Sequence, residues 1–126
     1  MTYQHHETGK LGERIAREYL EKQGYCILDT GARTKFGELD IVAREGETMV
    51  FVEVKTRRGN MFGRPEDAVD RRKQHHLAAC AHAYLYAHKL LAAPFRIDTI
   101  AIEMDEATHK AKLRHLKHAV PDQESN

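Results

Sequence analysis

Val50-Phe51-Val52-Glu53-Val54-Lys55-Thr56 is a strand-like run that carries a carboxylate and an amine in its apolar middle. Side chains alternate between the two faces of a strand, so Glu53 and Lys55 share one face. A run so rich in valine is typical of a buried strand, and burying a charge costs several kcal/mol unless the charge is paired, hydrogen-bonded or bound to metal. We therefore expect this strand to carry a functional site.

The segment before this run predicts a strand that pairs with it. Residues 38–43 alternate in character, with one face formed by Leu39, Ile41 and Ala43 and the other by Glu38, Asp40 and Val42. Glu45-Gly46-Glu47 is a turn, so the two strands should form an antiparallel hairpin. The hairpin would bring the face that bears Asp40 near the face that bears Glu53 and Lys55.

The remaining segments complete an α/β pattern. We expect helices from a Thr8 cap to a Gly24 stop and from Pro65 to about residue 91, strands over 25–30, 95–103 and around 112–116, a polar connection over 31–37 and a loop over 57–64. The order helix, three strands, helix, two strands predicts a mixed sheet covered by helices. Residues 1–120 should form one domain, followed by a frayed tail over 121–126.

Length and composition exclude several classes of protein. With 126 residues, of which 41% are hydrophobic and 31% charged, the chain has the balance of a soluble globular protein rather than a disordered one. No apolar run approaches the roughly 18 residues of a membrane span, and the N-terminus lacks the apolar centre of a signal peptide, so we expect a cytoplasmic protein. Cys26 and Cys80 should accordingly be free thiols.

Asp40, Glu53 and Lys55 together suggest a metal site. Mg²⁺ and similar hard cations bind oxygen ligands, commonly one or two carboxylates, and the backbone carbonyl of Val54 could add another ligand. Glu13 lies at the border of the first helix's apolar stripe and could approach the same place. A metal there would lower the pKa of a water and offset charge on a phosphate, while Lys55 would orient that water or stabilise the phosphate.

Each of these residues also has a simpler interpretation. Glu53 and Lys55 could be a pair on an edge strand whose charged face is solvated. Glu13 could be a first-turn glutamate favoured by the helix dipole. Glu38 shares the face of Asp40, but a solvated position at the start of a strand suits it better. For Asp98, in an apolar strand near Arg96, we favour a structural polar contact over a catalytic role.

The aspartate at position 40, the Glu53-Val54-Lys55 run and the preceding Glu13 resemble the PD-(D/E)xK nuclease superfamily, whose core is the restriction-endonuclease-like fold. More closely, the chain is similar to the small bacterial YraN (UPF0102) family over roughly residues 9–119. The segments that carry the likeness are Gly12-Glu13 with Ala16, Gly24-Tyr25, Gly37 to Val42, Phe51 to Arg57, Phe62-Gly63, Pro65, Lys73 and Arg96-Ile97-Asp98.

This resemblance implies a fold similar to that of archaeal Holliday-junction resolvases and metal-dependent hydrolysis of phosphodiester bonds in DNA. It also implies that Glu13, Asp40 and Glu53 bind Mg²⁺ or Mn²⁺ and that Lys55 is the catalytic lysine. Lys73 and Gln74 would be auxiliary contacts. Resolvases need two active sites to cut two strands, so a homodimer is expected by analogy.

Basic residues follow the candidate site. The net charge is only +1, but Lys55 to Lys73 holds seven basic residues against three acids. DNA phosphates are negatively charged and are neutralised by basic side chains. The candidate DNA contacts are therefore Arg57, Arg58, Arg64 and Lys73. The alternative is a solvated loop and helix start. Met61 and Phe62 in this loop either touch bases or pack onto the fold.

A zinc site at His76 and Cys80 is improbable, because a structural zinc needs four ligands and no second ligand pair is placed to meet them. Three functional hypotheses remain open. The first is a metal-dependent endonuclease that acts on DNA, including branched or single-stranded substrates. The second is a nucleic-acid-binding module of the same fold with little or no turnover. The third is an interaction protein whose charged patches bind a protein partner.

Overall fold

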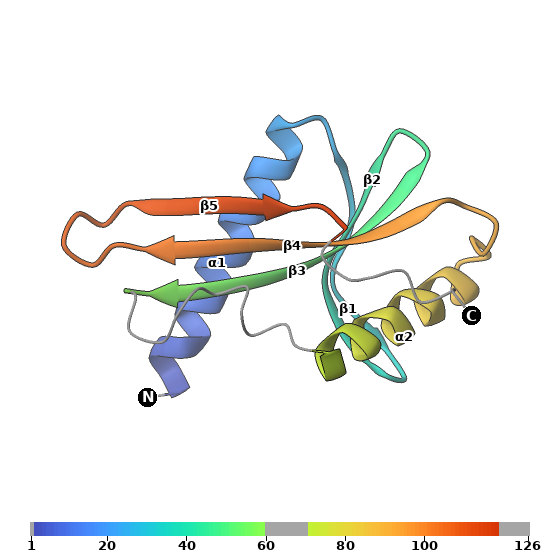
Figure 1. The fold of residues 1–126 in the computed structure, drawn as a ribbon, viewed down its shortest axis with the longest axis horizontal. Helices are drawn as coiled ribbons and strands as arrows, with labels where there is room; N and C mark the ends of the chain where they lie inside the picture. The colour runs from blue at the N-terminus through green and yellow to red at the C-terminus, as the bar shows by residue number, and fades with distance from the viewer. Residues whose placement is uncertain (1, 60–70, 119–126) are drawn as a thin grey trace.

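The computed structural model describes residues 2–59 and 71–118 and contains a five-stranded mixed sheet with two helices (Figure 1). The elements in chain order are α1 (Thr2–Lys22), β1 (Cys26–Thr34), β2 (Gly37–Glu45), β3 (Thr48–Arg58), α2 (Arg71–Ala87), β4 (Phe95–Met104) and β5 (Ala111–Leu116). This order confirms the predicted α/β class and the predicted mixed sheet.

The strands lie in the sheet in the order β1-β2-β3-β4-β5. β1 and β2, β2 and β3, and β4 and β5 pair antiparallel, whereas β3 and β4 pair parallel with α2 in the connection between them. The predicted hairpin between β2 and β3 is thus confirmed. Because β3 is the central strand, the interpretation of Glu53 and Lys55 as a pair on an edge strand is wrong.

Several boundaries differ from the sequence prediction. The helical backbone of α1 begins at Thr2, so Thr8 does not cap the helix. β1 begins after Tyr25 and runs to Thr34, because pairing with β2 continues as far as Thr34–Gly37, and only a two-residue turn remains of the predicted polar connection. β3 extends through Arg58, which is paired with β4 rather than in a loop. α2 ends at Ala87, short of the predicted residue 91.

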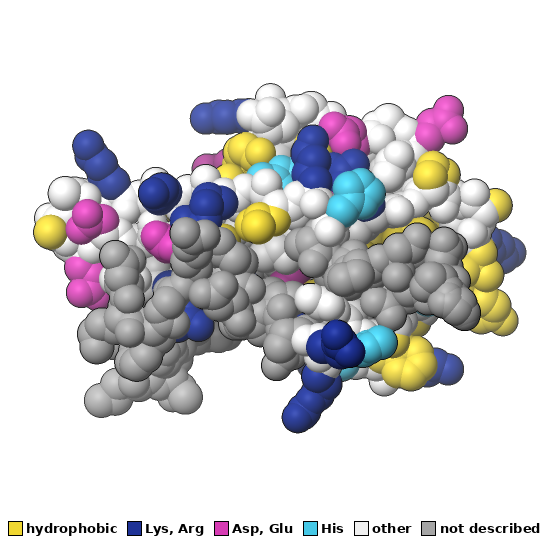
Figure 2. Space-filling view, viewed as in Figure 1, with side chains coloured by type: hydrophobic (Ala, Val, Ile, Leu, Met, Phe, Trp, Pro, Cys, Tyr) yellow, Lys and Arg dark blue, Asp and Glu magenta, His cyan; other side chains and the backbone are white. Residues whose placement is uncertain are grey.

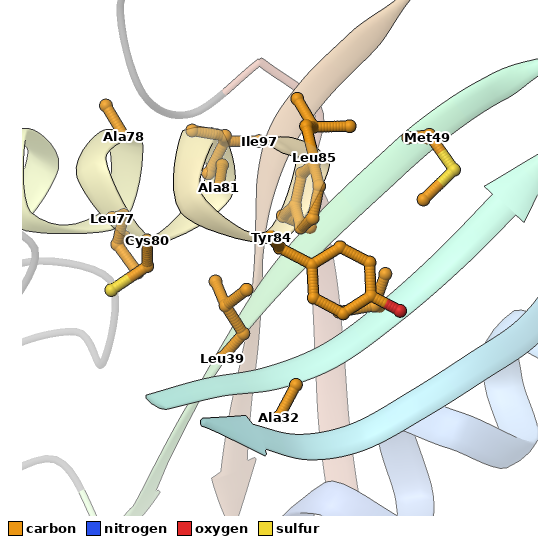
Figure 3. Packing of buried hydrophobic residues seen from close by; sticks show 12 residues of the cluster. Ala32, Leu39, Met49, Leu77, Ala78, Cys80, Ala81, Tyr84, Leu85 and Ile97 are labelled. Atoms are coloured by element: carbon orange, nitrogen blue, oxygen red, sulfur yellow. The ribbon is translucent and has the colours of Figure 1, made fainter. Parts of the chain in front are cut away.

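Each face of the sheet has its own hydrophobic core. The core under α1 contains Ala16, Leu20, Ile41, Val50, Val52, Ile100 and Ile102. The core under α2 contains Phe51, Leu77, Ala81, Tyr84 and Leu85, and Figure 3 shows α2 lying over the strands there. The predicted alternation along β3 is therefore confirmed. His88 follows the end of α2; it is exposed, and its ring stacks on Tyr84.

The predicted alternation along β2 fails at Leu39. Leu39 packs with Val42 under α2, whereas Ile41 and Ala43 pack under α1. Pairing between β2 and β3 ends at Ile41–Val52, and nearer its start β2 is paired in the sheet with β1 but not with β3. The alternation therefore breaks at the point where β2 leaves β3.

Some predictions fall on residues outside the described ranges. These are the helix start at Pro65, the loop residues Met61, Phe62 and Arg64, and the tail over 121–126. Both cysteines are free, as expected; Cys26 is exposed and Cys80 is buried. Within residues 2–59 and 71–118, neither helix has the length and apolar character needed to cross a membrane.

Candidate functional site

Asp40 lies where β2 separates from β3. The last residue pair between the strands is Ile41–Val52, and the next acceptor along β2 is a side chain: Asp40 Oδ2 accepts the backbone N–H of Val54 at 2.8 Å. The carboxylate thereby satisfies a β3 donor that the sheet ladder no longer pairs. This contact holds Asp40 beside the segment of β3 that carries Glu53 and Lys55.

Glu53 is a buried carboxylate with two ammonium partners. Only 5% of the residue is exposed, and its Oε2 lies 3.2 Å from Lys55 Nζ and 3.5 Å from Lys73 Nζ. Lys55 comes from the same strand, whereas Lys73 comes from the first turn of α2. The two ammonium groups offset the free-energy cost of removing the Glu53 carboxylate from water, which explains how a charged residue can be buried on β3.

Glu13 approaches from α1, which packs closely on β3. Gly12 is buried there, and a Cβ at this position would overlap the Thr56 hydroxyl. Burial raises the pKa of Glu13, the charges of Glu38 and Glu53 raise it further, and Arg17 opposes the rise. Glu13 therefore experiences the charge of Glu53, although it comes from an element on the other face of the sheet.

The pKa of Asp40 reflects this crowding of carboxylates. Burial and the charge of Glu53 raise the pKa of Asp40 to about 7, with a smaller contribution from Glu13. The hydrogen bond from Val54 and the charge of Lys55 act in the opposite direction. Asp40 is consequently close to half protonated at neutral pH, and a cation bound nearby would favour its ionised form.

Asp40 and Glu53 have the chemistry of ligands to a divalent cation. Within residues 2–59 and 71–118, no three aspartate, glutamate, histidine or cysteine side chains already surround one metal position. Mg²⁺ commonly uses one or two carboxylates and takes its remaining ligands from water and phosphate. Asp40 and Glu53 meet that requirement, since both are hard oxygen donors, and the charge of Glu53 raises the pKa of both Asp40 and Glu13. The roles of Glu13 and of the Val54 carbonyl as metal ligands stay predictions.

Thr99 is a polar residue beside the site that sequence reasoning missed. It pairs with Glu53 in the register of β3 and β4, so both side chains lie on the α2 side of the sheet. The residue is 1% exposed, and its hydroxyl has no hydrogen-bond partner in the described part of the chain. A buried threonine in an apolar strand gives no sequence signal of such a position, because valine and threonine occur there alike.

The predicted DNA contacts are spread over two elements. Arg57 follows Lys55 on the same face of β3, whereas Arg58 points to the opposite face. Gln74 is half-buried beside Lys73 at the start of α2, where Figure 2 shows lysine, arginine and histidine side chains gathered at the surface. Of the predicted DNA contacts, Lys73 thus forms an ion pair with Glu53, while Arg57 lies farther along β3. Arg64 lies outside the described residues.

Asp98 belongs to a second polar cluster, on the α1 side of the sheet. It is fully buried; Arg96 Nε donates to both its oxygens at 3.1 Å, His115 Nε2 lies 2.8 Å from Oδ2, and the His118 N–H donates to Oδ1. Burial opposes ionisation, but the bonds from His115 and His118 and the charge of Arg96 hold the pKa of Asp98 below its usual value.

The Asp98 cluster ties α1 and several strands together. Arg96 also donates to the Tyr25 hydroxyl at 2.6 Å and to Glu45 at 2.9 Å, and the Tyr19 hydroxyl lies 3.0 Å from His115 Nδ1. Asp98 is thus bonded to Arg96, His115 and His118 at the centre of this cluster. This agrees with the structural role favoured from the sequence, although the sequence did not indicate the histidine partners of Asp98 or the tyrosines that bond to Arg96 and His115.

A surface cavity of about 500 Å³ lies elsewhere, near the turn between β4 and β5. Its lining consists of Gly59, Glu103, Met104, Asp105, Glu106, Thr108, Lys110, Ala111 and Lys112. None of the carboxylates around Asp40 lines it, so this cavity is separate from the candidate site.

Comparison with known proteins identifies relatives along most of the chain. The model of a family described as "Uncharacterised protein family UPF0102" matches residues 12–102, a span that includes Glu13, Asp40, Glu53, Lys55 and Lys73. A UPF0102 protein of Dehalococcoides mccartyi is 39% identical over 123 residues, which cover 98% of this chain and 100% of the relative. One from Syntrophotalea carbinolica is 48% identical over 109 residues, covering 85% of this chain and 89% of the relative.

Proposed function

This chain belongs to the UPF0102 family, and we propose that it is a divalent-metal-dependent endonuclease that hydrolyses phosphodiester bonds in DNA. The observation that carries the proposal is the arrangement around Glu53: a buried carboxylate with Lys55 at 3.2 Å and Asp40 on the adjoining strand. The sequence resembles the PD-(D/E)xK superfamily at these same three positions, which supports a restriction-endonuclease-like arrangement of the sheet.

In this proposal Asp40 and Glu53 hold Mg²⁺ or Mn²⁺, with Glu13 as a further acidic group of the site. The cation supplies positive charge that offsets the charge developing on the attacked phosphate and lowers the pKa of water. Lys55 orients the attacking water or stabilises the phosphate oxygens. Water attacks phosphorus in line with the leaving oxygen, and the P–O bond to that oxygen breaks. Lys73 contributes a second cation on the side of α2.

A cleavage assay tests the proposal. Labelled linear duplex, single-stranded and four-way-junction DNA are incubated with the protein in Mg²⁺, in Mn²⁺ and in EDTA. Cleavage should require metal and fall at least about 100-fold in Glu53→Gln and Lys55→Ala, as for the loss of a group that stabilises transition-state charge. Glu47→Gln and Lys22→Ala are matched controls, because both side chains are exposed on other parts of the chain. Cleavage that persists in both site variants contradicts the assignment.

One observation favours a second candidate, a nucleic-acid-binding module with little turnover. Glu53 Oε2 is already paired with two ammonium groups, which partly neutralise the carboxylate and compete with a cation for it. A module of this kind would bind DNA in EDTA with an affinity that falls as salt rises, and would cleave none of the three substrates. The same assay, combined with binding measurements at 50 and 200 mM salt, separates the two candidates.

A further inference from the structure

The two-residue turn between β1 and β2 is held by its own hydrogen bonds. The Thr34 hydroxyl accepts the N–H groups of Phe36 and Gly37, each at 3.1 Å, and donates to the Gly37 carbonyl at 2.8 Å. Thr34 and Gly37 are also the last residues paired between the two strands. The shape of this turn therefore does not depend on the Phe36 side chain packing inward.

Phe36 is indeed directed toward solvent. The residue is 46% exposed, and Lys35 Nζ lies 5.3 Å from the centre of its ring. Burial of a phenylalanine side chain stabilises a fold, so this protein forgoes part of that gain at position 36. Single exposed apolar residues are common on protein surfaces, and the meaning of Phe36 therefore depends on what surrounds it.

The turn lies against the part of α2 that borders the candidate site. A Cβ on Gly37 would overlap His76 Nε2 and lie 3.4 Å from Cys80 Sγ, so Gly37 seats the turn directly on α2. His76 is one helical turn after Lys73, whose ammonium group is 3.5 Å from Glu53. Along β2, Phe36 precedes Asp40 by four residues, about 13 Å of extended strand. Phe36 thus stands at the rim of the candidate site.

The exposed charges around Phe36 are mainly basic. Arg33 and Lys35 lie on the β1–β2 hairpin and Arg71 and Arg72 at the start of α2, and all four are exposed. Among the residues that the structure describes, the acidic neighbour on this hairpin is Glu38, which pairs in register with Arg33. Basic side chains that alternate with an exposed aromatic ring match a nucleic-acid strand, because the cations contact phosphates and the ring stacks on a base.

We propose that the Lys35–Phe36 turn binds a nucleic-acid strand that presents unpaired bases, with the Phe36 ring stacked on one base and Lys35 and Arg33 on the adjacent phosphates. At about 3.4 Å per nucleotide, a strand bound there reaches Asp40 after about four stacked nucleotides. The inference rests on the proposed function for the class of partner, but not on turnover. It defines the preferred substrate as single-stranded or branched DNA, because the bases of an intact duplex are not free to stack on a side chain.

Binding of a fluorescently labelled single-stranded oligonucleotide and of a blunt duplex, followed by anisotropy in EDTA, tests this inference. Phe36→Ala should weaken single-strand binding about 5- to 150-fold, the equivalent of about 1 to 3 kcal/mol per stacked base. Binding of the duplex should change less than about twofold, because its bases are already stacked on one another. Tyr86→Ala is the matched control, since Tyr86 is a 74% exposed aromatic residue near the end of α2; its substitution should leave both affinities unchanged.

Phe36→Trp adds a direct readout of stacking. The wild-type sequence contains no tryptophan, so all tryptophan fluorescence of the variant comes from position 36. The variant should retain single-strand affinity, and its emission should be quenched when a base stacks on it. Melting temperatures equal to that of the wild type would show that both variants are folded.

The outcomes separate this inference from the proposed function. If the wild type binds and cleaves DNA and Phe36→Ala binds the single strand equally well, the turn is not a stacking site and the nuclease proposal stands. If binding depends on Phe36 but no substrate is cleaved, the inference stands and the nuclease proposal fails. If the wild type binds neither DNA, both are overturned.

Discussion

The carboxylate of Asp40 accepts the backbone N–H of Val54 at 2.8 Å, at the point where β2 and β3 stop pairing. One carboxylate thus completes the hydrogen bonding of β3 and also belongs to the acidic group around Glu53. Substitutions at Asp40 consequently affect folding and chemistry together. Both the stability of the protein and its binding of metal should therefore respond to a change at Asp40.

Asp40→Asn should remove a pH dependence of stability. The pKa of Asp40 in the folded protein is about 7, above its ordinary value of 3.8, so the folded state holds the proton more tightly than the unfolded chain. Wild-type stability should therefore fall as pH rises from about 4 to 7, by at most about 4 kcal/mol. Asparagine keeps an acceptor for Val54 and does not ionise. In urea unfolding with EDTA, the variant should be more stable than the wild type at pH 8 and similar to it at pH 4.

Asp105→Asn is the control for this measurement, because Asp105 also accepts a backbone N–H but lies in an exposed turn. It should leave the pH dependence unchanged. Parallel stability curves for the wild type and Asp40→Asn would contradict the raised pKa.

Mn²⁺ or Mg²⁺ should raise the melting temperature of the wild type at pH 8. A ligand that binds only the folded state stabilises it by about 2.7 kcal/mol at one hundred times its dissociation constant. The increase should disappear on addition of EDTA and should be absent in Asp40→Asn and Glu53→Gln. Glu47→Gln, at an exposed turn, should respond like the wild type. An equal increase in both site variants would place the cation elsewhere on the chain.

Lys55 and Lys73 should each be able to stabilise the buried charge of Glu53 when the other lysine is removed. Either lysine alone leaves the buried carboxylate one ammonium partner, so Lys55→Met and Lys73→Met should each cost about 1 kcal/mol. The double variant should lose about 3 to 5 kcal/mol, more than the sum, because a buried charge is left unpaired. Urea unfolding of the four proteins measures this coupling. Adding Glu53→Gln to the double variant should restore most of the loss, and strictly additive effects would contradict the shared pairing.

Asp98→Asn should destabilise the protein strongly without involving the candidate site. The change removes the buried one of the two negative partners of a nearly buried Arg96, the other being the more exposed Glu45, and should cost about 3 to 5 kcal/mol. The pKa of Asp98 is lowered in the folded state. The ionised carboxylate therefore stabilises the fold above its ordinary pKa, and this stabilisation is lost as pH falls below about 4. Glu103→Gln on the same strand is the control: its half-exposed ion pair with Arg114 should contribute at most about 1 kcal/mol. Equal losses in thermal unfolding would contradict this difference.

Much of the local structure could be predicted from the sequence. The alternation of Val50 and Val52 with Phe51 and Glu53 correctly separated the two faces of β3. The same rule failed at Leu39, where β2 is no longer paired with β3. β1 was predicted too short, because its polar second half is held in the sheet by pairing with β2, and pairing partners are not visible in local composition.

The sequence by itself determined that Glu53 and Lys55 share one face of a valine-rich strand, because an extended backbone directs alternate side chains to opposite sides. Only the tertiary structure decided which charges meet them. Lys73 reaches Glu53 from α2, Glu13 approaches from α1, and Asp40 turns to Val54 where two strands separate. These contacts join segments far apart in the chain, so they depend on how helices pack on the sheet, and no local preference of the residues sets that packing.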